Sequence, residues 1–178
     1  LGIFLGLNVL GLISGTIGAS PSSIVGQPNF VKKVVFPLEV LPAAMTGALA
    51  YDLLIGFGLC LMGILFLGPG LSLSVLYVPV ILFPVFLMAF GLSWFFSALG
   101  VFVRDVSQLG SFLGLALLYG SGVFYSAEKA QAAAPGIWQF LQWNPILQVI
   151  DSLRQVTLWG GELDWWKVGY AWAFGLVV

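Results

Sequence analysis

Histidine is absent from the 178 residues, and cysteine occurs once, as Cys60. These two facts exclude a disulfide framework, a His/Cys metal site, and Ser-His-Asp or Cys-His nucleophilic chemistry within the chain. Charge is also scarce, at 7% of residues against about 25% in a soluble domain. Six basic and seven acidic side chains cannot cover a water-soluble surface of this size, and a net charge of −1 gives no electrostatic case for nucleic acid.

Hydrophobic residues make up 60% of the chain and occur in runs bounded by charges or turn residues. A helix needs roughly 20 apolar residues to cross a bilayer core, so these runs predict membrane-spanning helices. The sequence predicts an all-α, polytopic transmembrane helical bundle that forms a single domain over residues 1–178. We expect spans at residues 1–17, 43–67, 71–103, 106–125 and 167–178.

Two stretches interrupt the apolar pattern. Residues 18–42 carry serines, prolines and two lysines, which predicts a polar connector with room for a short helix at the membrane surface. Residues 126–166 carry charges and tryptophans around apolar stretches that are too short to span, which predicts interfacial or re-entrant helices. Within the spans, Pro79 and Pro84 predict a kink, and small residues between Gly110 and Gly122 predict close helix packing.

The lysines and arginines predict the orientation. Alternating spans place the 18–42 connector and Arg104 on one side of the membrane and the 126–166 segment on the other. Basic residues are denser in the short loops of the connector side, which predicts that this side is cytoplasmic.

Four motifs resemble one family of membrane proteins. The run from Asn29 to Pro42, NFVKKVVFPLEVLP, resembles the connector before the third transmembrane helix of ABC-2 type permeases that export O-antigen, capsule or teichoic acid. Three further matches follow in the family's order, namely Phe102-Val103-Arg104-Asp105-Val106, Asn144-Pro145 and Asp151-Ser152-Leu153-Arg154. One departure is Leu38, which stands where many relatives carry a basic residue.

The resemblance implies a six-helix permease fold, of which this chain is a fragment without the first span and an amphipathic N-terminal helix. It implies a transport permease in the bacterial inner membrane rather than an enzyme, working as two permease chains with two copies of a separate ABC ATPase. The sequence contains no G-x-x-x-x-G-K-[ST] phosphate loop, so we expect no cofactor in this chain and ATP with Mg on the ATPase. The implied substrate is a polyprenyl-linked polysaccharide in membrane lipid.

The resemblance also implies functional residues. The ATPase-coupling candidates are Asn29, Lys32, Lys33, Phe36, Pro37, Glu39 and Pro42, although the lysines alone equally fit a positively charged anchor at the lipid surface. Arg104 and Asp105 form either an exposed ion pair or a brace at a helix end. The aromatic candidates for a substrate path are Tyr119, Tyr125, Trp138 and Trp143, which also fit an interfacial aromatic belt.

Asp52 is a carboxylate inside an apolar span, so it is either near an interface or part of an intramembrane polar site for transport. Two rival functions remain at this stage. One is an ABC-2 permease for a drug, lipid or other small molecule. The other is a membrane-embedded glycan-handling enzyme, for which the only polar cluster comprises Asp151, Arg154, Glu162 and Asp164.

Overall fold

The computed structural model describes residues 1–27, 37–67, 72–103, 105–125, 131–132, 135–161 and 163–178. Every regular element in these ranges is helical, which confirms the predicted all-α bundle. In chain order they are α1 (Gly2–Val25), α3 (Val40–Leu67), the 3₁₀ turn η1 (Leu73–Tyr77), α4 (Val78–Phe102), α5 (Val106–Gly120), α7 (Pro135–Leu141), α8 (Pro145–Arg154), the π-helical turn η2 (Gln155–Trp159) and α9 (Trp165–Val177).

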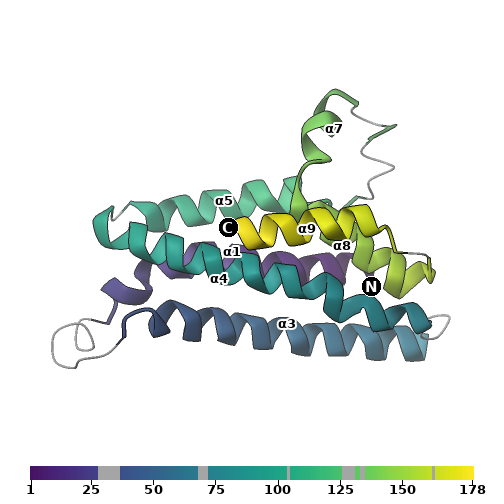
Figure 1. The fold of residues 1–178 in the computed structure, drawn as a ribbon, viewed down its shortest axis with the longest axis horizontal. Helices are drawn as coiled ribbons and strands as arrows, with labels where there is room; N and C mark the ends of the chain where they lie inside the picture. Colours follow the sequence, from purple (N-terminus) through teal and green to yellow (C-terminus); the bar gives the residue numbers. More distant parts are fainter. Residues whose placement is uncertain (28–36, 68–71, 104, 126–130, 133–134, 162) are drawn as a thin grey trace.

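Helix α1 lies at the centre of the bundle, in contact with α3, α4, α5 and α8, and α9 packs on α4 and α8. The long helices run roughly side by side and alternate in direction (Figure 1). One end of the bundle, the connector end, holds the end of α1, the start of α3 and the passage from α4 to α5. The opposite end, the tryptophan end, holds η1, α7, the start of α8, η2 and the start of α9.

Three stretches of helix are long and apolar enough to cross a bilayer, judged by length and composition among the described residues: α1, α3 up to Phe66, and Leu73–Phe102. Helix α5 is shorter, since its 15 residues extend only about 22 Å. It stops at a turn in which Gly122 has φ 68°, a backbone conformation that glycine adopts without steric cost.

Two helix boundaries differ from the sequence-based expectations. Helix α1 continues beyond Ile17 to Val25, through the serines assigned to the connector. The hydroxyls of Ser22 and Ser23 donate to the carbonyls of Ala19 and Ser20, so the polar side chains are satisfied by the helix itself. The third span is not one kinked helix from residue 71, because η1 precedes α4 and Pro79 occupies the first turn of α4, where a missing N–H costs nothing.

Glycines bring the helix backbones together at the predicted small-residue positions and elsewhere. A Cβ built on Gly110 of α5 would lie 2.8 Å from the Cα of Gly18 in α1, which confirms the expected close packing there. A Cβ on Gly100 of α4 would overlap the backbone of Pro21, and one on Gly175 of α9 would lie 2.8 Å from the carbonyl oxygen of Pro84. Both interior prolines therefore face a glycine of a neighbouring helix.

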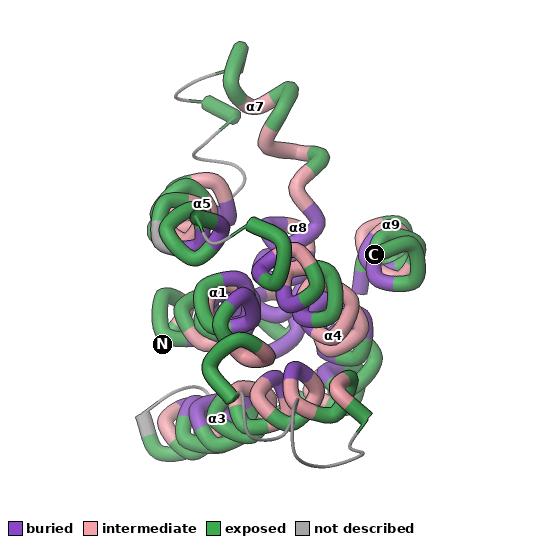
Figure 2. The backbone as a smooth tube through the Cα atoms, turned by 90° about the vertical axis from the view of Figure 1, so that its left-hand side faces the viewer, coloured by how far each residue is buried: buried purple, intermediate pink, exposed green. Residues whose placement is uncertain are grey.

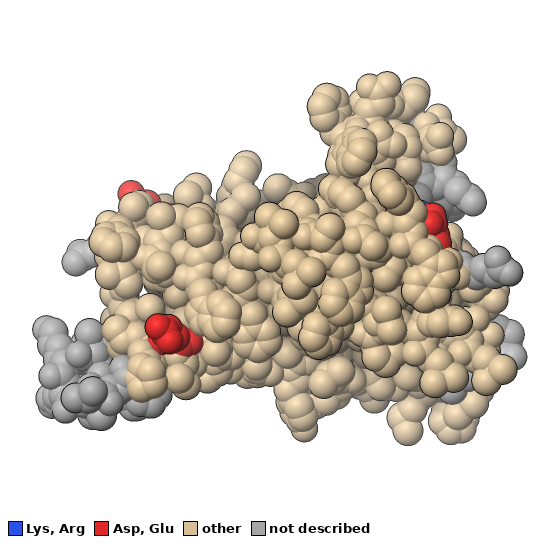
Figure 3. Space-filling view, viewed as in Figure 1, with Lys and Arg blue, Asp and Glu red and all other residues tan. Residues whose placement is uncertain are grey.

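The buried core of the bundle is mainly apolar. The core is formed where α1, α4 and α8 meet, and includes Leu5, Leu12 and Ile13 of α1, Ile81 and Val85 of α4, and Ile150 and Leu153 of α8 (Figure 2). On the face drawn in Figure 3, acidic atoms lie only toward the two ends of the long axis, with an uncharged band between them. Such a band fits the hydrocarbon core of a bilayer.

Candidate functional site

At the connector end, the start of α3 is tied to two other helices. The indole Nε1 of Trp94 in α4 donates to the carbonyl of Glu39 at 3.1 Å. The buried hydroxyl of Ser93 donates to the carbonyl of Pro42 at 3.1 Å and accepts from the hydroxyl of Ser20 in α1 at 3.2 Å. These bonds join α1, α3 and α4 at one point.

The side chain of Glu39 is exposed beside this joint, while its backbone is held. Of the predicted coupling residues, Pro37 precedes the turn that leads into α3 and Pro42 lies in the first turn of that helix. The other four, Asn29, Lys32, Lys33 and Phe36, lie outside the described residues. The structure thus describes an exposed carboxylate on an anchored backbone at this end.

Asp105 stands at the start of α5, exposed, as the residue that precedes the helix. Its carbonyl oxygen accepts from the backbone N–H groups of Gln108 and Leu109, and its side chain makes no capping bond. Arg104 lies outside the described residues, so the predicted helix-end brace stays a prediction.

At the tryptophan end, α8 is almost wholly buried although it is only ten residues long. Asn144 fixes its start, because its side-chain oxygen accepts from the N–H of Ile146 at 3.0 Å and its amide donates to the carbonyl of Gly120 at 2.9 Å. Pro145 follows in the first turn, where proline is favoured. The Asn-Pro pair therefore joins the end of α5 to the start of a helix inserted among α1, α4 and α9.

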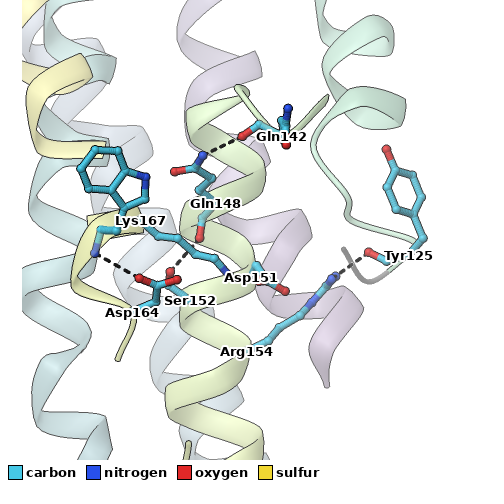
Figure 4. A network of polar contacts seen from close by, with 9 residues as sticks. Tyr125, Gln142, Gln148, Asp151, Ser152, Arg154, Asp164 and Lys167 are labelled. Atoms are coloured by element: carbon cyan, nitrogen blue, oxygen red, sulfur yellow. Dashed lines mark hydrogen bonds and ion pairs between the residues drawn. The ribbon is translucent and has the colours of Figure 1, made fainter. Parts of the chain in front are cut away.

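Arg154, at the end of α8, binds backbone rather than a carboxylate. The two terminal nitrogens of its guanidinium donate to the carbonyls of Gly122 at 2.8 Å, Tyr125 at 3.1 Å and Val123, and Nε donates to the carbonyl of Gly2 at 3.1 Å. Figure 4 shows the bond to Tyr125. Burial lowers the pKa of this guanidinium from its usual value, and Asp151 opposes the shift. An arginine stays protonated in proteins, so this side chain is a permanent four-bond link between the turn after α5 and the start of α1.

Asp151, one turn earlier on α8, forms an ion pair with Lys167 of α9, with 2.8 Å between Oδ2 and Nζ (Figure 4). The two side chains of the Asp-Ser-Leu-Arg motif thus have different partners. The described members of the polar cluster on which an enzyme would depend therefore have separate partners: Asp151 pairs with Lys167, and Arg154 binds backbone carbonyls. Asp164 accepts from the N–H of Trp166 at the start of α9 at 3.1 Å, and Glu162 lies outside the described residues.

A pocket of about 250 Å³ opens beside this ion pair, between α7, α8 and the start of α9. Its apolar lining is mainly indole, and its polar lining is amide and charge: Trp138, Gln142, Trp143, Leu147, Gln148, Asp151, Asp164, Trp166 and Lys167. Gln148 donates from Nε2 to the carbonyl of Gln142 at 2.6 Å, while its Oε1 is buried and has no hydrogen-bond partner in the part of the chain that the structure describes.

The four predicted aromatic residues separate into two places. Trp138 and Trp143 line the pocket. Tyr119 and Tyr125 do not; instead, the hydroxyl of Tyr125 donates to the carbonyl of Tyr119 at 2.6 Å, and the Tyr119 ring is exposed. The structure therefore brings two of the four residues into one site.

Asp52 lies about 18 Å from the start of α3, more than three turns into a 28-residue helix, and is exposed on the surface of the chain. It borders a groove between α1 and α3 that also includes Asn8 and Gly11. This position is nearer the middle of the helix than its end, and the choice between an interfacial carboxylate and an intramembrane polar site stays a prediction.

Several residues of these sites were missed from the sequence. Ser20, Ser93 and Trp94 gave no signal because their partners are distant in the chain, up to 73 residues away. Gln148 could have been found, since it lies one helical turn before Asp151 and on the same face of a short helix that begins at Pro145. Lys167 was predicted only as the start of a span, and Trp166 only as one of the tryptophans of the 126–166 segment.

Comparison with known proteins gives a consistent result. The family model described as ABC-2 type transporter matches residues 1–158. The chain is 24% identical over 157 residues to the Klebsiella pneumoniae protein named O-antigen export system permease protein RfbA, with 88% of this chain and 59% of that protein covered. A second K. pneumoniae protein of that name is 23% identical with the same coverage. The chain spans about 59% of the length of these curated relatives.

Proposed function

The chain belongs to the ABC-2 type transporter family, and from this premise we propose that it is the membrane permease of an exporter for a lipid-linked polysaccharide in the bacterial inner membrane. The bundle of apolar helices supports a permease, and the similarity to proteins named as O-antigen export permeases supports the polysaccharide. The observation that carries the proposal is the joint at the connector end, where Trp94 and Ser93 hold the start of α3 against the central helices.

A separate ABC ATPase, in two copies with ATP and Mg, would dock at the connector end of two permease chains. The exposed carboxylate of Glu39 supports this. Because the backbone of Glu39 is held by a hydrogen bond, its charge has a defined position at which a partner protein can bind. When the ATPase closes, the joint would carry the displacement into α1 and α4 as a rigid-body shift.

The opposite end would release the polymer. Sugar rings present apolar C–H faces and hydroxyl edges, so indole rings with polar neighbours suit their passage. Trp138 and Trp143 meet this condition in the pocket, and we place them on the substrate path together with the exposed ring of Tyr119 and its partner Tyr125.

A second candidate function is export of a lipid or another apolar small molecule by the same ATPase-driven mechanism. It is favoured by an almost wholly apolar groove of about 380 Å³ between α3 and α4, lined by Leu54, Phe57, Leu61, Val75, Val78, Pro79, Leu82, Phe83 and Phe86. Deleting the gene in the native host and measuring surface polysaccharide separates the two candidates.

The test of the docking proposal is copurification of the full-length permease with its ATPase. We expect Glu39→Lys to remove most of the bound ATPase, because the substitution reverses the charge of the exposed handle without breaking the backbone bond to Trp94. Asp105→Lys is the matched variant, an exposed acid at the same end of the bundle. Equal loss with both variants would attribute binding to the net charge of that end, and full retention with Glu39→Lys would contradict docking there.

A further inference from the structure

We propose that the pocket between α7, α8 and the start of α9 is a binding site for one uncharged sugar ring, which holds the polymer at its exit. This inference rests on the proposed function, because it assigns a ligand to a part of the same substrate path. It adds a discrete site to that path, built from polar groups of α8 and α9 as well as from tryptophans.

The size of the pocket fits a single ring. Its volume of about 250 Å³ is below the roughly 300–1,000 Å³ of sites for drug-sized ligands. Trp143 and Trp166 leave 61% and 79% of their surfaces uncovered by the chain, so their faces are accessible to a ligand. Trp143 is also held in place, because the hydroxyl of Tyr170 donates to its carbonyl at 2.8 Å and the two rings lie 6.1 Å apart.

The polar wall contains an acceptor that lacks a donor. The amide of Gln148 is oriented by its bond to the Gln142 carbonyl, which leaves Oε1 buried and unpaired among the described residues. An unpaired buried acceptor is unfavourable, and a ligand O–H would satisfy it. Lys167 adds donors to the same wall, since its ion pair with Asp151 engages one of three N–H groups.

The combination of groups distinguishes a sugar from the other small ligand that indoles bind well, an ammonium head group. An ammonium group would find acceptors here in Asp164 and in Oε1 of Gln148, but it only donates, so it would leave the amide and lysine donors of this pocket unused. A hydroxyl both donates and accepts, and a sugar ring carries several hydroxyls around an apolar face. Donors, acceptors and indole faces in one small pocket therefore favour the sugar.

The site is also rigid at its base. Asn144 and Arg154 hold the two ends of α8 through backbone carbonyls, and the Asp151–Lys167 pair joins α8 to α9. Polar groups kept in fixed positions before binding lose little conformational entropy when a ligand arrives.

The experiment is photo-crosslinking in the native host, with p-benzoylphenylalanine placed at Trp143 in the full-length permease. Trp138 is the second position in the pocket, and Trp159 is the matched control, an exposed tryptophan in η2 outside the pocket. After illumination, the purified permease is stained for glycan and analysed by mass spectrometry. We expect a glycan adduct at Trp143 or Trp138 at least tenfold above that at Trp159.

A polar substitution tests the amide. Gln148→Leu should lower the adduct at Trp138 by about tenfold, the effect of losing one hydrogen bond to a ligand hydroxyl. Gln139→Leu, an exposed glutamine of α7 outside the pocket lining, should leave the adduct unchanged.

Three results separate the alternatives. If polymer export requires this permease but neither pocket position gives more glycan adduct than Trp159, the sugar site is wrong and the proposed function stands. A phospholipid adduct at Trp143 in place of glycan would assign the pocket to a lipid head group and would likewise overturn the inference. If surface polysaccharide is unchanged when the gene is deleted, the proposed function itself fails.

Discussion

Among single residues, Arg154 has the largest set of distant partners in the described part of the chain. It donates to carbonyls in the turn after α5 and at the start of α1. The most distant of these partners, Gly2, is 152 residues away along the chain. The motif Asp-Ser-Leu-Arg was visible in the sequence, but the division of its charges was not. An aspartate and an arginine three residues apart on a helix suggest a mutual pair. Here the arginine donates to backbone carbonyls, and the aspartate forms its ion pair with Lys167.

We expect Arg154→Leu to lower the free energy of unfolding by about 3 kcal/mol, because two buried and two partly buried carbonyls lose their donor. Arg154→Lys should lose less, since an ammonium group keeps the charge but cannot match the guanidinium fork. The measurement is thermal unfolding of the detergent-solubilised permease.

Lys167→Met is the control for removal of a cation at the same end. The side chain of Lys167 is 26% exposed and that of Asp151 is 10% exposed, so this variant leaves one largely buried carboxylate unpaired, and its cost should be about 1–2 kcal/mol, less than that of the four lost bonds of Arg154. If Lys167→Met destabilises the permease as much as Arg154→Leu, the backbone clamp is not what stabilises this end.

Asp52 gives the second prediction at a single position. A carboxylate facing lipid near the middle of a helix costs roughly 3 kcal/mol, so its exposed side on α3 should face water or protein in the working transporter. We expect Asp52→Leu to leave the yield and thermal stability of the permease unchanged, since the carboxylate is exposed on the chain, and to reduce export of the polymer. Tyr51→Leu, a substitution at its exposed neighbour, should change neither. Normal export with Asp52→Leu would show that the carboxylate has no role in transport.

At the level of helices, the three long apolar helices of the described residues could be predicted because runs of about 20 apolar residues have few alternative folds. What could not be predicted depends on neighbours. Ser20 and Pro21 are typical of a helix end, yet α1 continues through them. The hydroxyl of Ser20 donates to Ser93 of α4, and the backbone of Pro21 packs against Gly100 of α4. Helix α8 is too short to span, so the sequence left open whether it is interfacial or re-entrant; in the structure it is almost wholly buried, in contact with α1, α4 and α9.

The close approach of α1 and α4 can be tested by adding one methyl group. A Cβ on Gly100 would overlap the backbone of Pro21, and backbone cannot move aside as a flexible side chain can. We expect Gly100→Ala to separate the two helices and destabilise the permease by about 2 kcal/mol, as overpacking does elsewhere. The readout is the fraction that remains monodisperse in gel filtration after heating.

The control is Gly58→Ala on α3, where an added Cβ meets nothing within 4 Å. This variant should be neutral or slightly stabilising, because alanine favours helix over glycine. Equal behaviour of the two variants would mean that α1 and α4 do not approach as closely as described.

For the molecule as a whole, the two ends differ in the chemistry that they present. The connector end offers an exposed acid on an anchored backbone, and the tryptophan end offers indoles, amides and an ion pair. An ATP-driven exporter requires this division, because the motor and the product are on opposite sides of the membrane. The sequence predicted the division through its two polar segments, while the helical joints that connect the ends became visible only in three dimensions.

Single cysteines can show which end of the bundle faces the cytoplasm. Cys60 is 1% exposed, so the natural chain should react poorly with a membrane-impermeant maleimide and serve as the background. Gln139→Cys lies on the exposed surface of α7 at the tryptophan end, and Gln27→Cys follows α1 at the connector end. We expect Gln139→Cys to be labelled in intact cells whose outer barrier is permeable to the reagent, and Gln27→Cys to be labelled only after the inner membrane is opened. The reverse pattern would place the joint of α1, α3 and α4 on the outer side, where no ATPase could reach it, and would remove the basis for ATP-driven export by this chain.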